Sequence, residues 1–379
     1  MLTPQSEAEL SEIVTGAKAP LRIIGGGTRP IGTPQAGDTL STAGLSGVTL
    51  YEPGALTLVA QAGTPVEEVE AALAKEGQRL AFEPMDHRGL LGTSGTPTIG
   101  GVVAGNISGP RRVSSVGACR DSLLGVRFVD GMGRILKNGG RVMKNVTGYD
   151  LNKLMCGSWG TLGVLSEVAL KVLPQTHCTG GLVIEGLSDD EAVKVLSRAL
   201  ATPFEVTGAA HFQKGPDGTP VTMIRVEGSD ASVRYRTGEL ERLLSDTGTV
   251  RIEPDAGRNS ADWQAVRDVA PFHGTQGDVW KLSVKPSDAP GIVARIDGGE
   301  ALYDWGGGLV WLQVPQGRQA EAIRAAVDEK GGHATLVRGR NAVATFHPPK
   351  PGVEAIEAGL RQRFDPKGVF NPGLMGRVA

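Results

Sequence analysis

The fold is decided at Leu21-Arg22-Ile23-Ile24-Gly25-Gly26-Gly27-Thr28-Arg29-Pro30-Ile31-Gly32. The first four residues predict a short buried strand, and a glycine-rich loop follows it directly. Consecutive glycines let several backbone N–H groups point at one spot, because no Cβ blocks a close approach or a positive φ. The loop therefore predicts a phosphate-binding site with Arg29 adding positive charge, although a tight structural turn is the alternative for this loop alone.

A second loop of small residues covers Thr98 to Asn106, where the start of a helix is expected to face a phosphate. Two such loops match the two phosphates of a dinucleotide. The first loop does not have the G-x-G-x-x-G spacing, since Pro30 stands at its sixth position, so a Rossmann nicotinamide site is a poor match. Arg111 and Arg112 follow the second loop and are predicted to neutralise phosphate charge, with a solvated arginine pair as the alternative.

The periodicity of apolar residues predicts an α+β chain of two domains. In the first, a helix between Thr3 and Pro20 precedes the strand, and Thr64, Pro65 and Glu67 predict a capping box that opens a second helix. From about Gly180, strands interleaved with helices predict an antiparallel sheet covered by helices, with repeated βαβ-type units. The expected boundaries are residues 1–175, 176–350 and a C-terminal segment, 351–379, that packs back on the first domain.

Composition and charge exclude several classes of protein. The 379 residues carry 39 basic and 41 acidic side chains, which gives no electrostatic footprint for nucleic acid. No stretch approaches the roughly 20 apolar residues that span a bilayer, so we expect a cytoplasmic chain with no membrane span of its own. The three cysteines are too few and too scattered for a disulfide framework or an iron–sulfur cluster, and any such cluster is expected in a partner. No two of the six histidines lie within four residues of each other, so no metal site is expected.

Further motifs are more specific than glycine turns. They are Ser108 to Arg112, Val142 to Leu151, Gly157 to Gly163, Gly331 to Leu336, and the pair Asp365-Pro366 and Asn371-Pro372-Gly373. Through them the chain resembles the flavoproteins of the vanillyl-alcohol oxidase/PCMH type, and most closely the E subunits of bacterial glycolate oxidases. The resemblance implies a PCMH-type FAD-binding domain of two α/β subdomains plus an antiparallel-sheet and helix cap domain.

The resemblance also implies which residues contact FAD. The first loop would wrap the pyrophosphate, the second would approach the phosphates and the flavin, and residues 157–164 would contact the adenosine side or the edge of the isoalloxazine ring. The FAD is expected to be non-covalent, because residues 20–40 contain no histidine or cysteine. The predicted FAD contacts are Gly25, Gly26, Gly27, Thr28, Arg29, Pro30, Ile31, Gly32, Thr98, Ile99, Gly100, Gly101, Ala104, Gly105, Arg111, Arg112, Gly157, Ser158, Gly160, Thr161, Gly163, Val164 and Asn371.

Oxidation of a 2-hydroxy acid needs a base for the hydroxyl proton, a cation for the carboxylate and a flavin N5 that accepts hydride. The predicted catalytic residues are Lys281, His333 and Arg338, with a half-exposed sheet lysine and a structural histidine as the alternatives for the first two. The predicted substrate is a small 2-hydroxy acid.

Three functions fit the sequence. The first is the FAD-binding subunit of a glycolate oxidase complex, beside a second FAD-binding subunit and an iron–sulfur subunit. The second is a free-standing D-2-hydroxy-acid dehydrogenase of the D-lactate type. The third is a non-catalytic FAD-binding scaffold.

Overall fold

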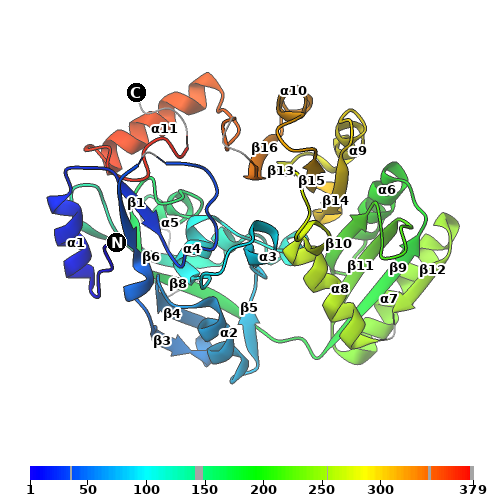
Figure 1. The fold of residues 1–379 in the computed structure, drawn as a ribbon. Helices are drawn as coiled ribbons and strands as arrows, with labels where there is room; N and C mark the ends of the chain where they lie inside the picture. Colours follow the sequence, from blue (N-terminus) through cyan, green and yellow to red (C-terminus); the bar gives the residue numbers. More distant parts are fainter. Residues whose placement is uncertain (35, 141–147, 254, 340–342, 376–379) are drawn as a thin grey trace.

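The computed structural model describes the whole chain except residues 35, 141–147, 254, 340–342 and 376–379. Part of the motif from Val142 to Leu151 therefore lies outside the described residues. The chain forms two lobes (Figure 1), with the strands up to β8 and helix α11 in the first lobe and the strands from β9 to β16 in the second. The predicted α+β class is confirmed. No helix in the described ranges is long and apolar enough to cross a membrane.

The first lobe holds two sheets. Strands β1 and β2 pair in parallel, and a larger sheet has the antiparallel order β3-β4-β8-β6-β7 with β5 on the end of β8. The strands of the first lobe are β1 (Leu21–Ile24), β2 (Asp38–Ser41), β3 (Val48–Glu52), β4 (Thr57–Gln61), β5 (Gln78–Leu80), β6 (Leu123–Val129), β7 (Ile135–Gly139) and β8 (Val164–Pro174). Its helices are α1 (Glu7–Gly16), α2 (Val66–Ala74), α3 (Arg88–Leu91), α4 (Ile99–Ala104), α5 (Leu151–Met155) and α11 (Pro351–Phe364).

One local prediction in this lobe is wrong. Helix α2 begins after Pro65, which makes no side-chain capping bond, and the capping box predicted at Thr64 and Glu67 does not form. The Thr64 hydroxyl instead accepts from the backbone N–H of Gly47 and donates to the carbonyl of Gln61. The hydroxyl is therefore occupied by the preceding turn and is not free to cap the helix.

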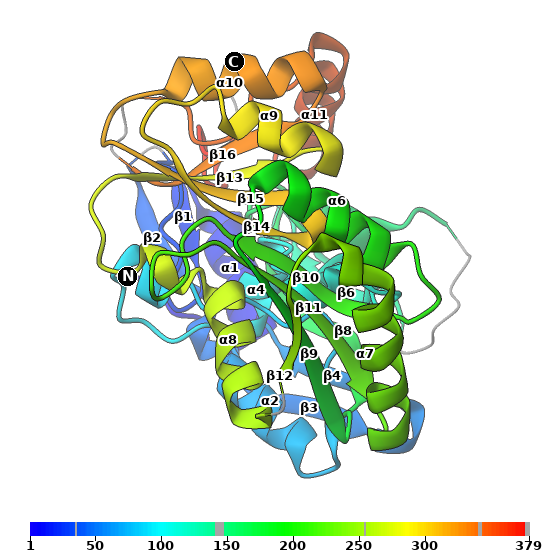
Figure 2. The same cartoon turned by 90° about the vertical axis from the view of Figure 1, so that its right-hand side faces the viewer.

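The second lobe is an eight-stranded antiparallel sheet in the order β12-β9-β11-β10-β14-β15-β13-β16. Two β-α-β-β-α-β units meet edge to edge where β10 pairs with β14, so the repeat predicted from the sequence is present. Figure 2 shows α6 and α7 covering the outer face of the sheet. The strands are β9 (Cys178–Glu185), β10 (Val206–Phe212), β11 (Val221–Gly228), β12 (Val250–Glu253), β13 (Asp278–Ser283), β14 (Glu300–Asp304), β15 (Leu309–Val314) and β16 (His333–Arg338); the helices are α6 (Asp189–Leu200), α7 (Asp230–Leu244), α8 (Ala256–Asp268), α9 (Ala289–Val293) and α10 (Ala320–Lys330).

The two lobes share one apolar core. Phe82, Met85 and Ile99 of the first lobe belong to the same buried cluster as Leu302 and Trp311 of the second. A shared core fixes the lobes relative to each other, since parting them would expose that surface to water.

The chain end returns to the first strand. Residues after α11 run beside β1, where Leu21 donates to the carbonyl of Val369 at 2.7 Å. The side chain of Asn371 accepts from the backbone N–H of Ile23 at 2.8 Å and donates to the carbonyl of Trp159 at 2.9 Å. The domain boundaries expected at residues 175 and 350 stay predictions.

Candidate functional site

The two glycine-rich loops pack directly against each other. A Cβ at Gly25 would lie 2.3 Å from the Oγ1 of Thr98, and one at Gly26 would lie 1.7 Å from the carbonyl oxygen of Thr96. Neither position can take a larger residue without moving backbone. Part of the glycine requirement is therefore the contact between the loops, which the sequence alone did not reveal.

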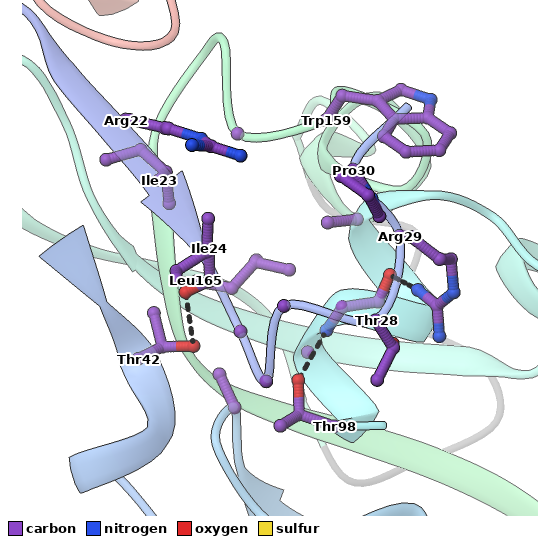
Figure 3. A pocket seen from close by; sticks show the side chains of 18 of the residues that line it. Arg22, Ile23, Ile24, Thr28, Arg29, Pro30, Thr42, Thr98, Trp159 and Leu165 are labelled. Carbon is purple, nitrogen blue, oxygen red and sulfur yellow. Dashed lines mark hydrogen bonds between the residues drawn. The ribbon is translucent and has the colours of Figure 1, made fainter. Parts of the chain in front are cut away.

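The loops line an open cavity of about 200 Å³, shown in Figure 3. It lies at the end of β1 and against α4, whose N-cap Thr98 accepts from the N–H of Gly101. Small-molecule sites typically measure roughly 300–1,000 Å³, so this cavity has room for part of a dinucleotide and not for all of it. Twelve predicted FAD contacts line it: Gly25, Gly26, Gly27, Thr28, Arg29, Pro30, Thr98, Gly100, Gly101, Ala104, Gly160 and Gly163.

Other predicted FAD contacts are placed elsewhere. Ile31, Ile99 and Val164 are core residues. The hydroxyl of Ser158 caps the end of α5 at the carbonyl of Met155, whereas Thr161 and Asn371 line a separate groove beside α11. The remaining predicted FAD contacts do not line the cavity either. They are Gly32, Gly105, Gly157, Arg111 and Arg112.

Arg29 and Arg22 are the two arginines that line the cavity. Arg29 is the one that lies against α4. Its Nη1 donates to the carbonyl of Gly101 at 2.6 Å, and this is the one bond that its guanidinium makes to the described residues. The buried Nε has no partner there. Burial lowers the pKa of Arg29 to about 10, so the group stays charged at neutral pH. A cation that uses one of five N–H donors, beside a glycine-lined hollow, fits a bound phosphate.

Arg111 lies in an ion-pair network between the lobes and not in the cavity. Its Nε and Nη2 donate to Glu227 at 2.9 Å each, and Nη1 lies 3.4 Å from Glu83. Arg225 donates two bonds to Glu83, and Arg79 reaches Glu227 at 2.7 Å. Burial alone would raise the pKa of Glu227, but the bonds and charges of these arginines hold that pKa well below its ordinary value. Arg111 therefore ties the lobes together.

Arg112 lies against an aromatic ring of the second lobe. Its Cζ is 4.2 Å from the ring centroid of Trp305, whose Nε1 donates to the carbonyl of Gly109 at 3.0 Å. Within the described part of the chain the Arg112 guanidinium has neither a hydrogen bond nor an ion pair. Trp305 has a φ of 52°, a left-handed conformation that costs a non-glycine residue energy and that recurs at functional sites.

Lys281, predicted as a catalytic residue, belongs to the second lobe and lies beside the ring of Trp305. It pairs in register with Trp311, and its Nζ lies 5.7 Å from the centroid of Trp305 and 5.9 Å from that of Trp311. Burial, followed by the charge of Arg112, lowers the pKa of Lys281 to about 8. No described residue makes a hydrogen bond or an ion pair with its ammonium group.

Two further titratable residues near Lys281 were not predicted from the sequence. His87 is buried, with its Nδ1 3.3 Å from the carbonyl of Met85, and burial followed by the charges of Arg29 and Lys281 lowers its pKa well below its ordinary value. Burial raises the pKa of Asp304 to about 7. The glycine run after Asp304-Trp305 was the one sequence signal for this region.

The other two predicted catalytic residues have different surroundings. His333 is exposed on β16, and its ring lies 5.7 Å from that of His347. The Arg338 guanidinium donates to the carbonyls of Gly277, Leu90 and Phe272 and to the hydroxyl of Thr275, so it links the end of α3 to the second lobe. Their catalytic roles stay predictions. Among the described residues no group of three or more histidine, cysteine, aspartate or glutamate side chains could hold a metal ion.

Comparison with known proteins identifies relatives of the whole chain. A family model described as an FAD binding domain matches residues 1–139. The glycolate oxidase subunit GlcE of Escherichia coli is 38% identical over 360 residues, which cover 94% of this chain and 93% of that protein. The glycolate oxidase subunit GlcD of Bacillus subtilis is 28% identical, covering 99% of this chain and 88% of that one. The solved structure of 4-ethylphenol oxidase from Gulosibacter chungangensis superposes with a TM-score of 0.72 at 13% identity, covering 98% of this chain and 88% of that one, which shows a shared fold.

Proposed function

Since this chain belongs to the FAD-binding GlcE family of glycolate oxidase subunits, we propose that it is the FAD-bearing subunit of a complex that oxidises glycolate to glyoxylate. FAD is its cofactor, and its reaction class is that of an FAD-dependent 2-hydroxy-acid oxidoreductase. The observation that carries the proposal is the cavity between the two glycine-rich loops, with Arg29 at its wall.

The residues of this cavity fit the cofactor. The glycines leave backbone N–H groups open to an anion, and Arg29 has donors to spare beside them. They would hold the pyrophosphate, and Trp159 and Gly160, which also line the cavity, would border the cofactor. When bound, the flavin accepts the hydride that leaves the carbon bearing the hydroxyl group. The FAD would be held without a covalent bond to the protein.

We further propose that electrons leave through partner subunits. The chain has three cysteines, and those at 119 and 156 are buried in the core of the first lobe, whereas an iron–sulfur cluster needs four ligands. An iron–sulfur subunit and a second FAD-binding subunit related to GlcD would complete the path.

A free-standing dehydrogenase is the second candidate. The unpaired cations Arg112 and Lys281 favour it, because they give this chain a place for a substrate anion of its own. A scaffold that holds FAD without turnover would have no use for them.

The deciding experiment is an absorbance spectrum of the purified chain, followed by anaerobic addition of glycolate with and without the partner subunits. Flavin bands that bleach only with partners present support the complex, and bleaching by the chain alone supports the free-standing enzyme. A protein that neither contains nor takes up FAD would overturn the proposal.

A further inference from the structure

Two cations from different lobes meet beside Trp305, and neither makes an ion pair with a carboxylate of the described residues. Arg112 follows the second glycine-rich loop and lies 4.2 Å from the ring centroid, and Lys281 on β13 lies 5.7 Å from it. In the described part of the chain neither side chain makes an ion pair, although Arg111, next in sequence to Arg112, contacts two glutamates. The nearby Asp304 acts on Lys281 through its charge but makes no ion pair with it in the described part of the chain.

Holding these two cations together costs free energy when no anion is bound. Burying a charge without a partner costs several kcal/mol, and two like charges close together add repulsion. Contact with the tryptophan ring returns only about 0.5–2 kcal/mol for each cation. The lowered pKa of Lys281, caused first by burial and then by the charge of Arg112, is consistent with this strain. A bound anion would relieve it.

Lys281 is linked to the cofactor cavity through the buried His87. Arg29 lines that cavity, and the buried His87 lies within electrostatic reach of both Arg29 and Lys281. An anion held by Arg112 and Lys281 would therefore lie on the same side of the lobe interface as His87 and would act on a group that also senses Arg29.

We propose that Arg112 and Lys281, one from each lobe and both against Trp305, bind the carboxylate of the substrate in this chain. The inference rests on the proposed function, and it moves Arg112 from the cofactor phosphates to the substrate. The carboxylate would lie between the guanidinium and the ammonium group, with the indole ring as an apolar wall.

The surroundings select a small monocarboxylate. Leu302 and Trp311 make the neighbouring sheet face apolar, and Asp304 is buried near Lys281. A second carboxylate would meet this apolar face or the like charge of Asp304. The site therefore favours glycolate or lactate over a 2-hydroxy dicarboxylate.

The test uses the FAD-loaded full chain and 2-hydroxy-2-methylpropanoate, a carboxylate that has no hydrogen on the hydroxyl-bearing carbon and cannot be oxidised. Binding is measured by the change in flavin absorbance and by tryptophan fluorescence. We expect Arg112→Gln and Lys281→Met each to weaken binding at least 10-fold, with Arg112→Lys and Lys281→Arg recovering part of it. The matched controls Arg120→Gln and Lys285→Met, both on exposed side chains, should bind like the parent.

The outcomes separate this inference from the proposed function. FAD content and melting temperature should be unchanged in Arg112→Gln, and loss of FAD in that variant would return Arg112 to the cofactor and overturn the inference. Parent-like binding in both variants, or no binding by an FAD-loaded parent chain, would also overturn it while leaving the FAD assignment intact. A chain without FAD would overturn the proposed function, and tryptophan fluorescence would still report whether the carboxylate binds.

Discussion

Arg111 and Arg112 are neighbours in sequence and have opposite surroundings. Arg111 enters a network in which every buried cation meets a carboxylate, and the side chain of Glu227 at its centre is only 2% exposed. Arg112 turns to the ring of Trp305 and meets no carboxylate among the described residues. Charged side chains at the lobe interface therefore have two roles. Paired charges hold the lobes in place, whereas unpaired charges are available to a ligand.

The largest loss of unfolding free energy is expected from breaking the ion-pair network of Glu83 and Glu227. Arg225→Met would leave Glu83 without its two strongest hydrogen bonds and remove a charge beside Glu227. Loss of one partner from a buried ion pair costs about 3–5 kcal/mol in unfolding free energy. Urea denaturation measures it, with Arg234→Met at the exposed ion pair with Asp230 as the control. A loss below 1 kcal/mol would show that the network does not hold the lobes.

The most direct test replaces each of the two neighbouring arginines separately. Arg111→Gln should lower the unfolding free energy by about 2–3 kcal/mol, because it removes charge-assisted bonds to a buried glutamate. Arg112→Gln should change it by less than about 1 kcal/mol, since it breaks one contact with a ring. Equal losses in the two variants would contradict the distinction between paired and unpaired charge.

Lys281→Met should stabilise the FAD-free chain at neutral pH by roughly 1–2 kcal/mol, after allowance for partial solvent screening. Because the folded-state pKa of Lys281 is lowered to about 8, the charged lysine destabilises the folded chain in full below about pH 8, and this cost disappears as pH rises to the pKa of lysine in the unfolded chain. The gain on substitution should therefore be larger at pH 7 than at pH 9.5. Thermal melting of both proteins at the two pH values checks this, and a gain that grows with pH would refute it.

The smallest effect is expected where a ring supports a paired cation. Arg225 lies 4.6 Å from the ring of Trp263, so Trp263→Phe should cost about 0.5–1 kcal/mol and leave substrate binding unchanged. The matched change Trp305→Phe should instead weaken carboxylate binding, because that ring lies against both unpaired cations. Carboxylate titration and denaturation of both variants separate the two effects.

Local pattern predicted most of the fold. The strand at Leu21–Ile24 has the predicted bounds, because an apolar run ended by glycines is a local signal. The capping box at Thr64 failed, since a hydroxyl can bond to more than one neighbour and the choice depends on the turn before it.

For the site, the sequence by itself determined the two glycine-rich loops and the FAD-binding family, because glycine spacing and short motifs are local. Only the tertiary structure decided the surroundings of each charge. Glu227 lies 116 residues from Arg111 in sequence, and Trp305 is reached by Arg112 only when the lobes pack. The sequence shows where a charge stands in the chain, whereas its counter-charge, its burial and hence its pKa depend on which distant segment the fold places beside it.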